Sequence, residues 1–190
     1  MCSKNGSLSD SQILELVLRG QNDAYSLIVE RYEDKLMRYA LFILKDYDVA
    51  SDITQETFIK AYIKLRSFNT NKQFSPWVYR ILHNNAMNYI KRSKKTSSLG
   101  AVSEVDDNFL VSFKHDKTMD RAMMDKRVRS CLGKLDVKYR EVIMLSFFEN
   151  LKYDEISDVL HIPKSTVGVR IRRAKMVLKK VCEQEGVTYG

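Results

Sequence analysis

The side chains most able to do chemistry in this sequence are basic groups gathered in its C-terminal third. From Val159 to Cys182 the chain has no acidic residue, and seven lysines and arginines fall in this stretch. Each such cation can neutralise a DNA phosphate and release a condensed counterion. The residues are Lys164, Arg170, Arg172, Arg173, Lys175, Lys179 and Lys180. This pattern predicts the binding of a polyanion.

A second set of polar side chains recurs at helical spacing in the middle of the chain. Arg80, Asn84 and Asn88 repeat every four residues, and Lys91 and Arg92 follow one turn later. Asn can pair with a base edge through two hydrogen bonds, whereas Arg and Lys hold phosphate. A solvated polar face is an equally good interpretation of the two asparagines.

An aromatic loop precedes that stripe. The segment from Phe68 to Phe74 carries an aromatic residue at each end, and Trp77 follows it. Aromatic rings beside basic groups can stack or enclose an unpaired base of a single strand. Taken one by one, Phe68, Phe74 and Trp77 also suit a hydrophobic core, so both interpretations stay open.

The sequence contains no pattern typical of a catalytic, metal or disulfide site. There is no glycine-rich phosphate loop and no paired nucleophile and base, and the three histidines are scattered. The cysteines, Cys2, Cys131 and Cys182, are odd in number and lack CxxC spacing. We therefore expect a protein that is not an enzyme and that needs neither metal nor cofactor. Without an apolar leader or a membrane-spanning run, we expect it to be cytoplasmic.

The C-terminal basic stretch lies on a predicted helix-turn-helix. Residues 153–160 have the apolar spacing of a short helix, and Pro163 must follow its end because proline cannot continue a helix. Ser165 is expected to cap a second helix, whose apolar face begins at Val167. In DNA-binding proteins the second helix of this motif enters the major groove. A solvated basic helix in an ordinary helical hairpin is the alternative.

The first half of the chain predicts four helices. With only 7 Gly and 2 Pro in 190 residues, long helices are favoured over a turn-rich β fold. Apolar residues follow the helical period over most of residues 13–90. The expected caps and stops are Ser9 with Gln12, Gly20, Asn22 or Asp23, Asp46 or Asp48, and Ser75 before Pro76.

Charge and periodicity divide the chain into two all-α domains. The net charge is +8, yet residues 8–56 hold ten acids and five basic residues, whereas residues 57–103 hold no acid. The acidic half suits a basic protein partner and the basic half a nucleic acid. We expect helical domains at 8–95 and 119–185, joined by a flexible linker at 96–118 that lets them move independently until a partner fixes them.

Together these elements resemble the extracytoplasmic-function (ECF) type of bacterial RNA polymerase sigma factor. The resemblance covers about residues 10–182: 48–65 is similar to the polymerase-binding helix, 68–95 to the loop and helix for the −10 element, and 135–180 to the domain that reads the −35 element. It implies a protein that binds core RNA polymerase and promoter DNA and directs promoter-specific initiation. Binding energy, without ATP hydrolysis, would open the strands, and an anti-sigma factor is an expected partner.

The resemblance also implies three sets of site residues. Those for core polymerase are Asp52, Gln55, Glu56 and Phe58. Those for the −10 element are Phe68, Asn69, Phe74, Arg80, Asn84, Asn88, Lys91 and Arg92. Those for the −35 element are Tyr153, Lys164, Ser165, Thr166, Gly168, Val169, Arg170, Arg172 and Arg173. We expect Arg172 and Arg173 to point outward.

The sequence departs from the family pattern at two places. Asp136, a good N-cap, stands where the family often has proline. Gly168 and Val169 stand where the family usually has polar or basic groups, which favours apolar contact over hydrogen-bond readout there. The main alternative function is a helix-turn-helix regulator without a role in polymerase specificity. Residues 1–118 show no βα alternation of a receiver domain to support it.

Overall fold

The computed structural model describes residues 8–96 and 126–186, and within these ranges it contains helices and no β-strand. This confirms the predicted all-α class. None of the described helices is long and apolar enough to cross a membrane. Most of the predicted linker lies outside the described residues. The helical elements are α1 (Asp10–Leu18), η1 (Asn22–Ala24), α2 (Tyr25–Leu44), α3 (Tyr47–Lys64), η2 (Leu65–Ser67), α4 (Phe74–Thr96), α6 (Lys126–Gly133), α7 (Val137–Ile143), η4 (Met144–Phe148), α8 (Tyr153–Leu160) and α9 (Lys164–Gln184).

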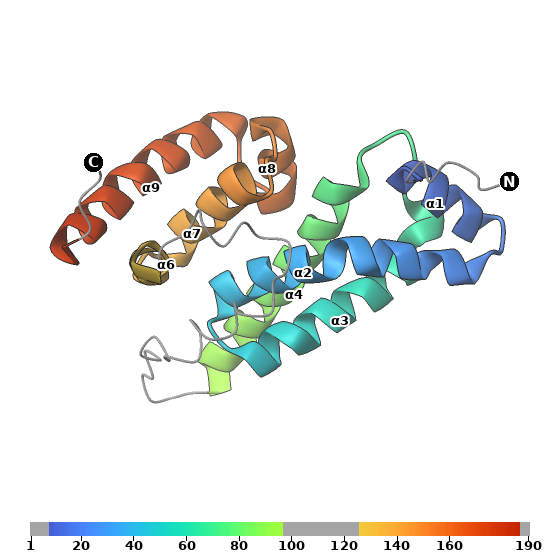
Figure 1. Cartoon of the computed structure of the whole chain (residues 1–190), viewed down its shortest axis with the longest axis horizontal. Helices are drawn as coiled ribbons and strands as arrows, with labels where there is room; N and C mark the ends of the chain where they lie inside the picture. The colour runs from blue at the N-terminus through green and yellow to red at the C-terminus, as the bar shows by residue number, and fades with distance from the viewer. Residues whose placement is uncertain (1–7, 97–125, 187–190) are drawn as a thin grey trace, which may run out of the picture.

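The N-terminal domain is built on the mutual packing of α2, α3 and α4, with α1 against α2 (Figure 1). Its helix boundaries follow local sequence signals. Ser9 and Gln12 form the predicted capping box, and the Asp46 carboxylate accepts a hydrogen bond from the Val49 amide at 3.0 Å. The core between the helices is aromatic at its centre, where the rings of Tyr39 and Tyr79 meet edge to face and are fully buried.

The C-terminal domain consists of α6 to α9. The short helix α8 has the predicted bounds, and it ends at His161, which adopts the left-handed conformation (φ 52°). The Ser157 hydroxyl donates to the carbonyl of Ile162 at 2.6 Å and fixes the turn before α9. Val167, Ile171 and Ala174 of α9 are buried as predicted, so the helix-turn-helix is present.

Three predicted caps differ in detail from the structure. Helix α4 begins at Phe74, one residue before the expected cap Ser75, which is allowed because Pro76 still lies in the first turn, where no amide partner is needed. Helix α9 is preceded by Pro163 as N-cap, and Ser165 falls inside the first turn. Asp136 holds the N-cap position of α7, but its side chain makes no capping hydrogen bond.

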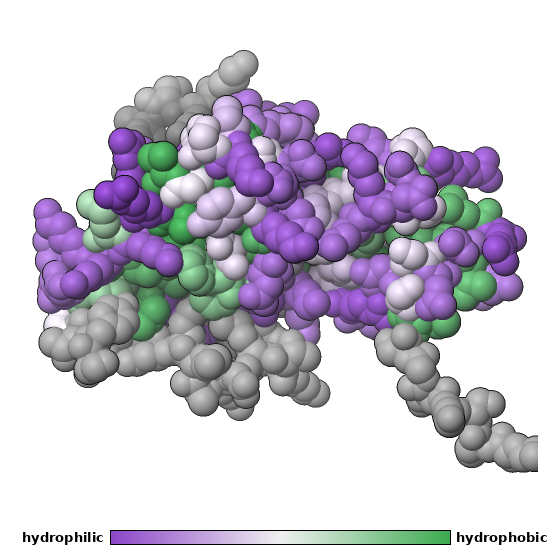
Figure 2. Space-filling view, turned by 90° about the horizontal axis from the view of Figure 1, so that it is seen from above, coloured by the Kyte–Doolittle hydropathy of each residue, from purple (hydrophilic) through white to green (hydrophobic). Residues whose placement is uncertain are grey.

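The two domains pack directly against each other. Helix α8 contacts α4, and α7 contacts α2, so that the hydrophobic core is continuous from one domain to the other. Helix α3 lies on the far side of α2 and α4 from the C-terminal domain (Figure 1). Hydrophilic residues cover most of the face that Figure 2 shows, and hydrophobic residues are exposed on it in patches. The independent movement of the domains stays a prediction, because this structure holds them together.

Candidate nucleic-acid interface

The loop before α4 is shaped by an asparagine turn and an aromatic cluster. The side-chain oxygen of Asn69 accepts a hydrogen bond from the amide of Asn71 at 3.0 Å, which closes a tight turn. The ring of Phe68 lies 4.7 Å from that of Trp77 and 5.8 Å from that of Phe74. Phe68 and Phe74 are buried, whereas Trp77 is partly exposed. Phe68 and Phe74 therefore belong to the hydrophobic core, and Trp77 leaves part of an aromatic surface open to solvent.

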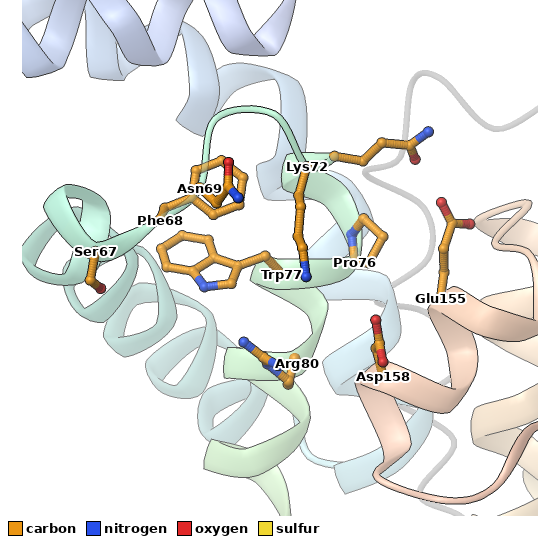
Figure 3. A pocket seen from close by; sticks show the side chains of 10 residues that line it. Ser67, Phe68, Asn69, Lys72, Pro76, Trp77, Arg80, Glu155 and Asp158 are labelled. Carbon is orange, nitrogen blue, oxygen red and sulfur yellow. The ribbon is translucent and has the colours of Figure 1, made fainter.

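This loop and the start of α4 border a cavity of about 470 Å³. Trp77 and Phe68 form its aromatic side, and Lys72 and Arg80 supply positive charge (Figure 3). A flat apolar surface beside two cations is the combination that binds an unpaired nucleotide, through base stacking and phosphate attraction. The full lining is Ser67, Phe68, Asn69, Lys72, Gln73, Pro76, Trp77, Arg80, Glu155 and Asp158.

The predicted polar stripe on α4 continues from this cavity. Asn84, Asn88, Lys91 and Arg92 are exposed, while Arg80 is half-buried at the cavity wall. The stripe can therefore follow a nucleic-acid backbone away from the cavity. Of the predicted −10 residues, only Phe74 is buried and does not line the cavity. Its ring packs against those of Phe68 and Trp77 from the core side.

A neighbouring asparagine has a structural role that the sequence did not reveal. Asn85 is buried; its side-chain oxygen accepts from Lys60 Nζ at 2.7 Å, and its amide donates to Thr57 Oγ1 at 3.1 Å. These bonds join α4 to α3. They fix the rotation of α4 about its axis, and so direct the exposed stripe outward.

The predicted −35 residues surround the start of α9. Ser165, Val169, Arg172 and Arg173 are exposed, as expected for the two arginines, and Thr166 is half-buried. The space around the Gly168 Cα is bounded by Tyr153 of α8: a Cβ built on Gly168 would lie 3.5 Å from the Tyr153 ring. A Cβ at this position would make only ordinary van der Waals contact, so the packing of α8 against α9 does not require a glycine here.

Two basic residues of this surface already have acidic partners. Lys164 pairs with Asp154 of α8 at 2.7 Å, and both side chains are well exposed. Arg170 pairs with Glu141 of α7 at 3.0 Å, and its side chain is only 28% exposed. An exposed pair exchanges readily with solvent or phosphate, whereas Arg170 must leave a buried carboxylate to reach DNA.

Helix α3 has an exposed face with acidic and apolar residues. Asp52, Gln55 and Glu56 of the predicted polymerase set are exposed, and Glu56 pairs with Lys60 at 2.6 Å. Phe58 is buried and belongs to the hydrophobic core. The large apolar groups that reach solvent on α3 are instead Tyr47, Ile59, Tyr62 and Ile63, and Ile63 is 71% exposed.

An ionic network lies where the two domains meet. Arg38 of α2 pairs with Glu149, which follows η4, at 2.9 Å, and both side chains are less than a tenth exposed. Glu141 lies 3.8 Å from His83 Nδ1 of α4, and His83 contacts the Tyr39 hydroxyl at 3.3 Å. Burial lowers the pKa of His83 to about 4 and raises the pKa of Glu141 to about 7. His83 is therefore neutral at pH 7.

Comparisons of the sequence with known protein families match its N-terminal and C-terminal parts to two separate family models. Residues 28–96 match the family model Sigma-70 region 2, and residues 125–178 match Sigma-70, region 4. The chain is 32% identical over 183 residues to the ECF RNA polymerase sigma factor SigW of Bacillus subtilis, a match that covers 88% of this chain and 93% of that protein. It is 31% identical to the RNA polymerase sigma-H factor of Pseudomonas aeruginosa, with 92% and 94% covered.

Solved structures show the same fold. CnrH, in complex with the cytosolic domain of CnrY, matches with a TM-score of 0.67 and 24% identity over 92% of this chain and 97% of that chain. The sigma factor RpoE of Bartonella quintana, in complex with the anti-sigma factor NepR, matches with a TM-score of 0.65 and 19% identity over 84% and 96%. The helical architecture and the extent of the sequence matches lead to one conclusion: the chain belongs to the ECF family of RNA polymerase sigma factors.

Proposed function

We propose that this sigma factor engages the −10 element through the aromatic cavity and the polar stripe of α4. The observation that carries the proposal is the cavity that Phe68, Trp77, Lys72 and Arg80 line. A base flipped from the non-template strand stacks on the aromatic side, and Arg80 and Lys72 hold the flanking phosphates. Asn84, Asn88, Lys91 and Arg92 then guide the strand along α4.

The −35 element is read by the start of α9 in the major groove. Lys164, Ser165 and Thr166 form the first turn of α9, where free backbone amides and the helix dipole favour phosphate. Val169 is exposed and suits contact with a thymine methyl group. Arg172 holds phosphate from the outer side of the helix, and Arg173 lies near enough the groove to contact phosphate or a guanine edge.

Core polymerase docks on the outer face of α3. The supporting observation is the mixture there of exposed acids, Asp52 and Glu56, with the exposed apolar residues Ile59 and Ile63. Protein interfaces typically combine an apolar centre with a polar rim. Phe58 supports this face from the core.

An anti-sigma factor is a further proposed partner. CnrH and RpoE, which share this fold, were solved in complexes with CnrY and with the anti-sigma factor NepR. Such a partner would have to bind a chain whose two domains already contact each other.

The separate roles of α3 and α4 are tested with three variants and two assays, one for binding to core polymerase and one for opening of the −10 region. Charge reversal at Asp52 and Glu56 should weaken binding to core polymerase. Whatever holoenzyme still assembles should bind the promoter as tightly as the wild-type holoenzyme. Arg80→Ala should keep core binding and lose opening of the −10 region, as followed by permanganate reactivity of unpaired thymines. The matched control is Lys35→Ala, which removes an exposed basic residue of α2 that belongs to none of the predicted DNA-binding sets. Unchanged core binding by the reversed variant would contradict the docking face.

A further inference from the structure

The C-terminal domain forms one wall of the cavity proposed for the −10 element. Glu155 and Asp158 of α8 line it opposite Lys72 and Arg80 (Figure 3). Among the described residues no ion pair joins the two walls. The acids therefore face the cations across the cavity and leave space between them. Glu155 is held in place because it also accepts a hydrogen bond from the amide of Lys152 at 2.6 Å.

Carboxylates in this place oppose the entry of a nucleic acid. A single strand that stacks on Trp77 must bring its phosphates to Lys72 and Arg80, which lie opposite α8. The negative charges of Glu155 and Asp158 repel those phosphates, and the helix itself occupies the approach. The N-terminal domain alone would leave the same cavity open on that side.

Contacts between residues far apart in sequence keep α8 there. The buried pair of Arg38 and Glu149 spans the two domains, and so do the stacked rings of Phe42 and Phe148, whose centroids lie 6.3 Å apart. A buried ion pair contributes little net stability, because its desolvation offsets most of the attraction. Such an interface closes in a defined geometry and yet opens when a partner stabilises the separated domains.

The same interface restrains the recognition helix and leaves the polymerase face open. Glu141 accepts from Arg170 of α9 and approaches His83 of α4. The exposed apolar residues Ile59 and Ile63 belong to α3, and this helix lies on the far side of α2 and α4 from the C-terminal domain (Figure 1). A polymerase can therefore reach α3 while the DNA cavity is covered.

We propose that the free chain inhibits itself: α8 is a built-in competitor of single-stranded −10 DNA, and the two domains must separate before the cavity takes a nucleotide. The inference rests on the proposed −10 function of the cavity. In this proposal Glu155 and Asp158 take the place of DNA phosphates in the cavity. The pair of Arg38 and Glu149 acts as a lock, which means that it holds the two domains together.

Trp77 gives a direct test of closure that needs no DNA. It is the only tryptophan of the chain and lines the cavity, so its fluorescence reports on the charge around it. The full-length variant E155Q/D158N should raise quenching of Trp77 by iodide and lower quenching by caesium. Gln at position 155 preserves the capping box of α8. The control E33Q/D34N removes two exposed acids from α2 and should change neither. Equal quenching in the two variants would overturn the proposal.

Binding of a fluorescein-labelled single-stranded DNA of mixed sequence completes the test. We expect E155Q/D158N to bind about threefold to tenfold more tightly than wild type, since apparent affinity scales with the fraction of open molecules. Glu149→Met should give a similar gain and a larger radius of gyration in small-angle X-ray scattering. If these variants match E33Q/D34N while Arg80→Ala still weakens binding, self-inhibition is wrong and the −10 site stands. If Arg80→Ala has no effect, the −10 site itself is wrong.

Discussion

Removing one partner of the ion pair between Arg38 and Glu149 should cost far more stability than removing one partner of an ordinary surface ion pair. The paired atoms of Arg38 and Glu149 lie 2.9 Å apart, and the two side chains are 9% and 4% exposed. Removing one partner of a pair buried this deeply leaves an uncompensated charge, which typically costs about 3–5 kcal/mol. The loss has an upper limit here, because the chain can separate its domains and hydrate the remaining charge. The measured cost therefore cannot exceed the free energy of domain closure.

A double-mutant cycle measures this coupling. Arg38→Met and Glu149→Met should each lower the free energy of unfolding, and the double variant should lose less than the sum, because methionines restore an apolar contact. Urea unfolding of the full chain is followed by Trp77 fluorescence, which reports on the N-terminal domain, and by circular dichroism, which reports on both. Where the lock is broken, the two transitions should separate.

The control for that cycle is an exposed ion pair in the same chain. Lys179 and Glu183 lie 3.9 Å apart on α9, with side chains 72% and 58% exposed. Their replacement should change stability by less than about 1 kcal/mol. The reasoning would be refuted if Arg38→Met and Glu149→Met gave equally small and additive losses with coincident transitions.

Three further changes have expected outcomes. Gly168→Ala should raise stability by up to about 1 kcal/mol in thermal unfolding, because alanine is the better helix former and its Cβ would only touch the Tyr153 ring; a loss would show that the packing is tighter than 3.5 Å implies. Asn85→Ala should cost about 1–3 kcal/mol in urea unfolding, because Thr57 and its neighbours lose a buried partner; a neutral result would contradict its role in joining α3 to α4. Burial raises the pKa of Glu141 from 4.5 to about 7, so its charge destabilises the folded state at pH 8, and this penalty disappears as pH falls through 7 toward 4.5. Glu141→Gln should therefore exceed wild type in stability at pH 8 and lose that advantage by pH 4.5; a pH-independent difference would be inconsistent with this shift.

Local sequence signals predicted most of the helices. The capping box of Ser9, the cap at Asp46 and the break before Pro163 each act within a few residues, so they can be recognised without knowledge of the fold. Small shifts remained where two residues could both begin a helix. Helix α4, for example, begins at the buried Phe74, one residue before the expected cap Ser75.

The candidate site was harder to predict, because helix faces and domain contacts depend on tertiary packing. Helix α3 carries apolar residues on two faces: Phe58 of the predicted polymerase set is buried, whereas Ile59 and Ile63, which that set did not include, are exposed. The partners Arg38 and Glu149 are 111 residues apart, and neither carries a local signal. The acidic wall that α8 adds to the cavity is a result of the same long-range packing.

Transcription in vitro with purified core polymerase tests the central claim most directly. The chain is added to core polymerase on genomic DNA, and the 5′ ends of the transcripts are mapped. The account predicts initiation at a defined set of sites that share two spaced sequence elements, lost with Arg80→Ala and retained with Lys35→Ala. Transcripts whose 5′ ends are the same with and without the chain would contradict it.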